Sequence, residues 1–349
     1  MPDTAFNEID ILSDKITKST IPDDLKSSVQ IRLEQLKKLT NSPTFLPEYD
    51  RMNKYIDWIV SLPWNKKSKD NLDLINAKKI LDINHFGLEE IKDRILEYIS
   101  VMKLKQEKNE GEDIYRAPIL CFVGLVGTGK TTIAYSIAEA LGRKIARIPF
   151  GGMGDPLDLR GQSKMHPEAE PGKIIKALRT TQFKNSVILL DEIDRVTDIG
   201  RASIMGVLVE LLDPGQNHAF SDHYIDYPFD LSECIFIATA NNTTSISTAV
   251  MDRLEPIMMP SYTDQEKITI GQKYVFPKAM KAAGIPSETL KIDDDVWVSL
   301  VRPLGYDAGI RTMERTIEGV VRKVARLIVE GKGTSFTVTL QNIKEFLPL

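Results

Sequence analysis

Residues 124–132, GLVGTGKTT, contain the spacing Gly-x-x-x-x-Gly-Lys-Thr, which is typical of a loop that binds phosphate groups. Glycine lets backbone N–H groups turn inward around phosphate oxygens, and the N-terminus of a following helix adds partial positive charge. Lys130 would reach the β- and γ-phosphates, and Thr131 would ligate Mg²⁺. An ordinary glycine-rich turn would not need this Lys-Thr pair. The predicted residues for ATP or ADP are Gly124, Gly127, Thr128, Gly129, Lys130, Thr131 and Thr132.

A second cluster, VILLDEID at residues 187–194, ends an apolar run with acidic side chains. A buried parallel strand delivers its last residue to the edge of the sheet where ligands bind. Asp191 would hold the Mg²⁺ through its water shell, and Glu192 would polarise the water that attacks the γ-phosphate. Combined with the glycine loop, the two carboxylates predict an enzyme that hydrolyses ATP.

Short apolar runs alternate with amphipathic helices between about residues 114 and 262. This alternation predicts an α/β domain whose parallel sheet is covered on both faces. The predicted strands are PILCFVG, KIARIPF, SVILLDEID, ECIFIATANN and PIMMPSY.

Helical patterns precede and follow this domain. One helix begins near Pro22 and has an apolar face, which would pack on its own domain or form an arm between domains or subunits. Helices return after residue 262, the longest from about 310 to 330, with a short strand expected at SFTVTL. We therefore predict an N-terminal helical arm at 1–46, a helical linker region at 47–113, the α/β domain at 114–262 and a helical domain at 263–349.

Composition excludes several classes of protein. The 349 residues carry a formal net charge of −4, which argues against a protein that mainly binds nucleic acid. No apolar run approaches the roughly 18 residues needed to cross a bilayer, and the acidic N-terminus is not a targeting peptide. The four histidines lack metal-ligand spacing. Cys121 and Cys234 lie in apolar runs, so we expect both to be buried and unpaired. Such cysteines are typical of a protein in a reducing compartment, and we expect a cytoplasmic location.

The chain resembles the AAA+ family of ATPases and, within it, the ATPase module of the Lon proteases. The resemblance covers about residues 45–349 and implies a P-loop domain with a five-stranded parallel sheet followed by a small helical lid. It is carried by the blocks EYDRMNKYIDWIVSLPWNKKSKDNLDL, AKKILDINHFGLEEIKDRILEYI, GLVGTGKTT, LLDEIDRV, ELLDPGQNHAFSDHYIDYPFDLS, ATANN, MDRLEPI and AGIRTMER.

The resemblance also implies roles for residues outside the phosphate loop. Asn241, which ends the strand CIFIATANN, matches the family's sensor 1 and would bind the attacking water or the γ-phosphate. Arg253 matches the arginine finger that acts on the neighbouring subunit's ATP, so a ring, a hexamer by resemblance, is expected. Arg311 matches sensor 2 in the lid. The segment His85-Phe86-Gly87 matches the one that covers adenine, although simple packing explains it equally well.

The sequence departs from the family in the loop between residues 161 and 171. Lon enzymes grip unfolded polypeptide there with an aromatic-aliphatic pair, and the corresponding residues here are His166 and Pro167. An imidazole followed by a rigid ring is a poorer generic grip, which Met165 would partly offset because thioethers adapt to varied surfaces. Glu168 and Glu170 add negative charge where the family is near neutral.

The family's N-terminal substrate domain and its Ser-Lys peptidase domain have no counterpart in these residues, so this chain alone is not expected to cut peptide bonds. Two readings of its function remain. In the first, a motor uses ATP to unfold and move proteins in protein quality control, passing them to a peptidase on another chain. In the second, a regulatory or assembly ATPase switches conformation without threading substrate. A motor that acts on nucleic acid is a distant third.

Overall fold

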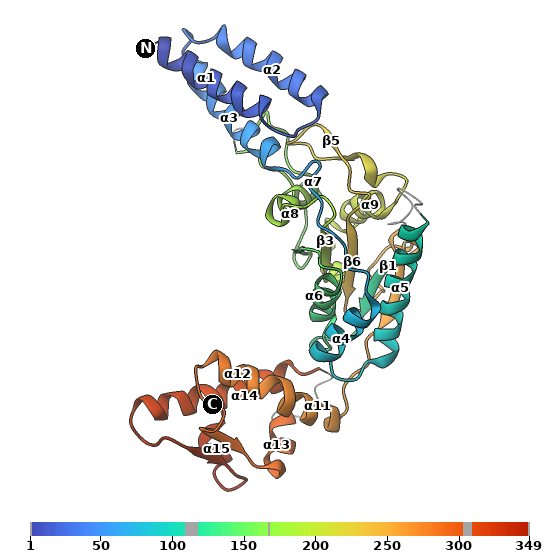
Figure 1. Ribbon diagram of the computed structural model, residues 1–349, viewed down its shortest axis with the longest axis vertical. Helices are drawn as coiled ribbons and strands as arrows, with labels where there is room; N and C mark the ends of the chain where they lie inside the picture. Colours follow the sequence, from blue (N-terminus) through green and yellow to red (C-terminus); the bar gives the residue numbers. More distant parts are fainter. Residues whose placement is uncertain (1, 109–117, 167, 303–308, 348–349) are drawn as a thin grey trace.

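The computed structural model describes residues 2–108, 118–166, 168–302 and 309–347. Figure 1 shows an elongated molecule, with the N-terminal helices at one end of the long axis, a helical domain at the other end and a parallel sheet between them. Within the described ranges, every helix is too short or too polar to cross a bilayer. The predicted boundary at 113/114 and the predicted loop residue Pro167 lie outside these ranges.

The central sheet has five parallel strands, as predicted, and their order is β2-β3-β6-β1-β7. Its strands occupy the five predicted apolar runs, which confirms the α/β class. The strands are β1 (Ile119–Val123), β2 (Ile145–Pro149), β3 (Val187–Asp191), β6 (Ile235–Ala240) and β7 (Leu254–Met258).

Alternate residues of each strand pack into two different cores, because side chains of a strand point to opposite faces. In β3, Ile188 and Leu190 belong to the core that also contains the N-terminal helices, whereas Val187 and Leu189 belong to a second core on the opposite face of the sheet. All five residues of β3 are buried. The sheet is therefore covered on both faces, and its carboxyl edge is the part left to bind a ligand.

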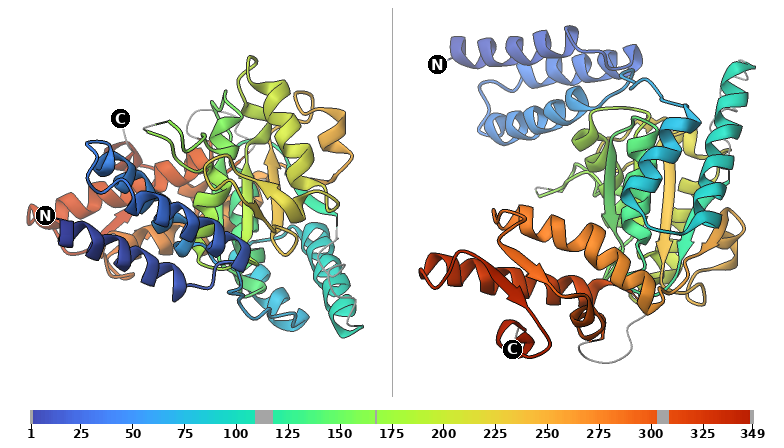
Figure 2. Two further views of the ribbon diagram at one scale, coloured as in Figure 1. Left: turned by 90° about the horizontal axis from the view of Figure 1, so that it is seen from above. Right: turned by 60° about the horizontal axis from the view of Figure 1, so that its bottom comes forward.

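Two layers of helices cover the sheet, and Figure 2 shows them on either side of it. One layer consists of two helices of the predicted linker region, α4 (Leu74–Asn84) and α5 (Glu89–Glu107), together with α6 (Lys130–Ala140). The other layer consists of α7 (Leu157–Arg160), α8 (Lys173–Thr181), α9 (Arg201–Leu212) and α10 (Thr248–Met251), beside a small hairpin of β4 (Phe220–Ser221) and β5 (Pro228–Phe229).

The N-terminal region contains one more helix than the sequence analysis predicted. Helix α1 (Pro2–Thr17) packs on the predicted helix, α2 (Asp23–Lys37), and on α3 (Phe45–Ser61). Its Ile9, Leu12 and Ile16 are buried in the same core as one face of the sheet. The three- and four-residue spacing of these apolar side chains was present in the sequence, but the many polar residues between them obscured it.

The C-terminal domain is helical, as predicted, but it also contains a two-stranded parallel pair. Strand β9 (Phe336–Val338) confirms the strand expected at SFTVTL, and its partner β8 (Leu290–Ile292) was not predicted. A π-helical turn at Gly271–Val275 interrupts the first helices, where Trp297 lies against Gly271. The helices are α11 (Asp264–Ile270), α12 (Phe276–Ala282), α13 (Trp297–Val301), α14 (Arg311–Val329) and α15 (Ile343–Phe346).

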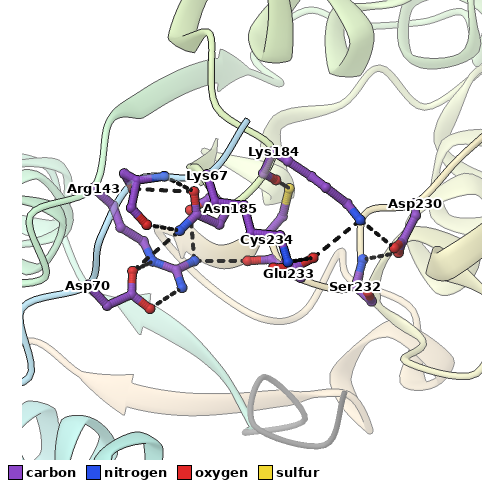
Figure 3. A network of polar contacts seen from close by, with 10 residues as sticks. Lys67, Asp70, Arg143, Lys184, Asn185, Asp230, Ser232, Glu233 and Cys234 are labelled. Atoms are coloured by element: carbon purple, nitrogen blue, oxygen red, sulfur yellow. Dashed lines mark hydrogen bonds and ion pairs between the residues drawn. The ribbon is translucent and has the colours of Figure 1, made fainter. Parts of the chain in front are cut away.

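A buried polar network closes the amino edge of the sheet (Figure 3). Arg143 makes a bidentate ion pair with Asp70 at 2.6 and 2.7 Å and donates to the carbonyls of Asn185 and Glu233 at 2.7 and 2.8 Å. Asn185 in turn exchanges hydrogen bonds with the backbone of Ser68. The network ties the linker segment to the start of β2, β3 and β6, so that the linker and the sheet are held together.

Candidate nucleotide-binding site

The phosphate loop connects β1 to α6 at the carboxyl edge of the sheet. Gly127 and Gly129 have φ angles of +83° and +95°, a region that favours glycine. A Cβ at Gly124 would lie 2.8 Å from Met259, so this position also requires glycine. The loop therefore has the backbone that the glycine spacing predicted.

Lys130 lies at the centre of this loop and is only 7% exposed. Its Nζ donates to the carbonyls of Gly124 and Leu125 at 2.6 and 2.9 Å, and to Asn241 Oδ1 at 3.2 Å. Burial lowers the pKa of Lys130, which the carboxylates around it oppose. These neutral acceptors are replaceable, so the ammonium group is available for a phosphate.

Asp191 is buried and accepts hydrogen bonds from three side chains. Thr131 and Thr239 donate to its Oδ1 at 3.1 and 2.5 Å, and Arg147 donates to its Oδ2 at 2.6 Å. The structure thus brings Thr131 and Asp191 together, as the predicted metal site requires. Arg147 was missed, although a lone arginine inside the apolar run KIARIPF was a signal.

The donor set suits Mg²⁺, which prefers oxygen ligands and keeps several waters. A threonine hydroxyl and one carboxylate lie side by side here, and the described residues contain no cluster of three or more His, Cys, Asp or Glu side chains that would favour another metal. Thr131 and Asp191 are the residues that would hold the ion, which supplies positive charge to the phosphates when bound.

Asn241 is held in place by Asp194, the last residue of the acidic run. The Asn241 amide N–H donates to Asp194 Oδ1 at 3.0 Å, and its side-chain Nδ2 lies 3.5 Å from Oδ2. Asp194 is 8% exposed and also accepts at its backbone carbonyl from Ser245. The sequence did not single out Asp194, which follows the predicted acids Asp191 and Glu192 by two residues. Its contact with Asn241 depends on the pairing of strands and is not visible in the local sequence.

Glu192 has a φ of +57°, a left-handed conformation that is rare for residues other than glycine. Its backbone N–H donates to Thr239 Oγ1 at 2.9 Å, so Thr239 anchors both acidic residues. The Glu192 side chain is partly exposed and lies near Gly151. Strained backbone of this kind is a common feature of functional sites.

The C-terminal domain contacts the phosphate loop directly. The backbone N–H of Ile310 donates to the Gly127 carbonyl at 3.1 Å. Tyr262, the last residue of the α/β domain before the helical domain begins, donates its hydroxyl to the Thr128 carbonyl at 3.3 Å. A Cβ at Gly309 would lie 2.4 Å from the Val126 carbonyl. Arg311 follows immediately as an exposed residue at the start of α14, close enough for its charge to lower the pKa of Lys130.

A cavity of about 720 Å³ lies beside the loop and is lined by the linker, α6 and the C-terminal domain. Gly129 and Thr132 line it on the loop side, and His85 and Phe86 line it on the linker side. His85 is buried and shares a 2.9 Å hydrogen bond with Ser136, and burial lowers its pKa to about 4. Gly87, with a φ of +63°, follows this pair. The cavity is large enough for a nucleoside next to the phosphate loop.

Two family models match the chain. Residues 120–262 match the ATPase family associated with various cellular activities (AAA), and residues 281–336 match the Lon protease AAA+ ATPase lid domain. The chain is 44% identical over 343 residues to a Lon protease of Lawsonia intracellularis and 41% identical over 340 residues to one of Elusimicrobium minutum. These matches cover 98% and 97% of the chain.

The chain belongs to the Lon family of AAA+ ATPases.

A third relative, Lon protease 2 of Thermus thermophilus, is 40% identical over 345 residues, and this match covers 97% of the chain. The chain spans about 40% of the length of these three curated relatives, and 42% at most. Membership of the AAA ATPase family implies that the chain binds nucleotide. The roles of the individual site residues remain predictions.

Arg253 is the predicted arginine finger of this Lon-family chain. Its hydrogen bonds go to Asp213 and Ala249, and not to the phosphate loop or Asp191. Its guanidinium donates to Asp213 Oδ2 at 2.7 Å and to the Ala249 carbonyl at 2.8 Å. The hydrogen bond from Arg253 is the main cause that lowers the pKa of Asp213. With 28% of its side chain exposed, Arg253 is accessible from outside its own subunit. Its role in a neighbouring site stays a prediction.

The loop that corresponds to the polypeptide-gripping loop of Lon enzymes is exposed. Met165 is 74% exposed and His166 is also exposed, while Pro167 lies outside the described residues. The negative charge of Glu170 is compensated by an ion pair with Lys176 at 2.6 Å, so the loop is less acidic than its sequence indicated.

Proposed function

We propose that this chain is an ATP-hydrolysing motor module that uses ATP to unfold and move polypeptide. The observation that supports it best is the set of hydrogen bonds that joins the phosphate loop to Asp191 and, through Asn241, to Asp194. Lys130 donates a hydrogen bond to Asn241, and Thr131 donates one to Asp191. Asp194 in turn accepts a hydrogen bond from the backbone N–H of Asn241. Glu192 follows directly after Asp191, and a site that only binds nucleotide would not need this second carboxylate.

The residues have separate tasks in this proposal. Backbone N–H groups of the loop and the Lys130 ammonium would bind the phosphates, and Thr131 and Asp191 would hold Mg²⁺. Glu192 would accept a proton from the attacking water, while Asn241 orients that water. Arg311 would report the presence of the γ-phosphate to the lid, which already touches Gly127 through Ile310.

Movement would follow from the same contacts. Because the lid binds the phosphate loop through Ile310, loss of the γ-phosphate would change what holds the lid against the sheet. The exposed loop at Met165 and His166 would transmit this change to a polypeptide. The partners in this proposal are identical subunits in a ring, which the resemblance to Lon enzymes makes a hexamer, an unfolded protein substrate and a peptidase on another chain. A reducing, cytoplasmic location stays a prediction from the two buried cysteines.

Stimulation of ATP turnover by an unfolded protein tests the proposed function. We expect casein to raise the steady-state ATPase rate of the full chain, and Met165→Ala to reduce this stimulation while leaving the basal rate unchanged. Ile199→Ala is a matched control, because Ile199 is an exposed apolar residue outside the loop. ATPase activity that is indifferent to casein would contradict threading and favour the regulatory or assembly ATPase.

A further inference from the structure

A second cavity, of about 310 Å³, lies between helices α2 and α3 and the exposed loop. We call it the helix–loop groove, and it is lined by Arg32, Gln35, Leu36, Leu39, Glu48, Arg51, Met52, Lys54, Tyr55, Lys164, Met165, His166, Ala169 and Tyr224. It shares no residue with the nucleotide cavity. Its size suits a few side chains rather than a folded domain.

The floor of the helix–loop groove is apolar and its rim is polar. Leu36, Tyr55 and Tyr224 are buried in the floor, whereas Leu39 is 39% and Met165 is 74% exposed. Exposed apolar side chains that gather beside a polar rim mark interaction sites. The floor therefore offers a place for apolar side chains of a bound segment.

The charge of the rim is strongly biased. Four cations line the groove, Arg32, Arg51, Lys54 and Lys164, but Glu48 is the only carboxylate among the lining residues. Glu48 pairs with Arg51 at 3.3 Å. This local excess of positive charge departs from the net charge of the chain, which is −4.

Intramolecular acids compensate this excess only in part. Asp226, beside the groove, is shared by Lys164 at 2.8 Å and Arg32 at 4.0 Å. Lys54 is exposed and donates to the Ala169 carbonyl at 3.3 Å, a neutral partner. Burial and the nearby Arg32 lower the pKa of Lys164, as expected where like charges are crowded.

We propose that the helix–loop groove binds an extended polypeptide segment in which acidic residues neighbour apolar ones. The apolar side chains would pack on Leu36 and Met165, and the carboxylates would pair with Lys54 and Arg32. The inference rests on the proposed function in that the occupant is the polypeptide on which the motor acts. The groove would then select which segments reach the exposed loop.

Fluorescence anisotropy tests the groove directly. The probe is a short fluorescein-labelled peptide of alternating glutamate and leucine, titrated with the full chain in the absence of ATP. We expect Lys54→Glu to weaken binding about tenfold, Arg32→Glu to do the same, and sodium chloride to weaken it further. Lys54→Arg should retain binding. Lys18→Glu is the matched control, because Lys18 is exposed, lies outside the groove and changes the net charge equally.

Three results would overturn the assignment. The first is equal binding of a peptide in which lysine replaces every glutamate. The second is unchanged affinity in both Lys54→Glu and Arg32→Glu, with unfolding midpoints that match the unaltered chain. The third is a single-stranded oligonucleotide that displaces the peptide with the same dependence on Lys54. Peptide binding without casein-stimulated ATPase would refute the motor but keep the groove, and the converse would refute only the groove.

Discussion

Glu192 and Lys130 lie within one hydrogen-bonded site but are assigned different tasks, which substitutions can separate. We expect Glu192→Gln to retain nucleotide binding and to lower the ATPase rate roughly 10²–10⁴-fold, because an amide cannot accept the proton of the attacking water. Lys130→Ala should instead lose binding, since it removes the buried ammonium group. Titration with a fluorescent nucleotide measures binding, and the release of phosphate measures the ATPase rate. A Glu192→Gln chain that turns over ATP normally would contradict the assignment.

His85 makes the stability of the fold dependent on pH. Its pKa is about 4 in the folded chain and 6.5 in its ordinary state, so between these values the unfolded chain binds more protons than the folded one. The stabilisation is complete above pH 6.5 and is lost as the pH falls toward 4. We expect this group to cost about 2 kcal/mol in free energy of unfolding between pH 7 and pH 5.

Urea unfolding at the two pH values measures this contribution, with His85→Gln as the comparison because glutamine does not titrate. The difference between pH 7 and pH 5 should be smaller in His85→Gln by that amount. An equal pH dependence in both chains would show that His85 is not the group responsible.

At this scale the sequence predicted the residues that have a motif and missed those that only support them. The loop from Gly124 to Thr131 and the acids after β3 were predictable, because their spacing and the apolar strands before them are local features. Arg147, Asp194 and Thr239 act through contacts between neighbouring strands. The order in which parallel strands pair is not local, so these contacts could not be read from the chain.

Among the elements, the approach of the lid to the phosphate loop depends on Gly309. A Cβ there would lie 2.4 Å from the Val126 carbonyl and 2.6 Å from the Gly127 carbonyl carbon, so Gly309→Ala has to push the lid away. We expect weaker nucleotide binding and a lower ATPase rate with little change in the unfolding midpoint. Gly206→Ala is the control, because nothing lies within 4 Å of its Cβ. Unchanged nucleotide affinity in Gly309→Ala would contradict the lid contact.

The linker is attached to the sheet by the pair of Arg143 and Asp70, whose side chains are 0% and 5% exposed. Arg143→Ala would leave Asp70 buried without its partner and orphan two carbonyls, so a loss of about 3–5 kcal/mol in free energy of unfolding is expected. Lys18→Ala, which breaks an exposed pair, should cost well under 1 kcal/mol. Chemical denaturation of both chains gives the comparison. Equal losses would show that the network in Figure 3 is not a stabilising one.

The elements themselves were largely predictable, because strand-length apolar runs between amphipathic helices have few other solutions. The exceptions have identifiable causes. Helix α1 carries its apolar side chains among many polar ones, and β8 is a three-residue strand whose partner β9 is distant in the sequence. The π-helical turn at Gly271–Val275 lies where Trp297 packs against Gly271, a tertiary contact that local sequence does not reveal.

For the whole molecule, a single subunit is incomplete in the proposed mechanism. Arg253 pairs with Asp213 on its own subunit, away from its own phosphate loop, so it would have to release Asp213 to reach a neighbour. An arginine supplied in this way is worth about 10³–10⁵ in rate. We therefore expect the ATPase rate per subunit to rise with protein concentration as rings form. Light scattering shows the dilution at which the rings dissociate. An ATPase rate per subunit that stays constant through this dissociation would argue for a site that is complete within one chain.

The central claim is that two subunits build each hydrolytic site, and mixing two inactive variants tests it most directly. Arg253→Ala keeps an intact Glu192, and Glu192→Gln keeps an intact Arg253, so random mixing in a closed ring restores about a quarter of the interfaces. We predict that an equal mixture, assembled with ATP, recovers about a quarter of the unaltered ATPase rate although each variant alone has almost none. A mixture no more active than its components would contradict the account.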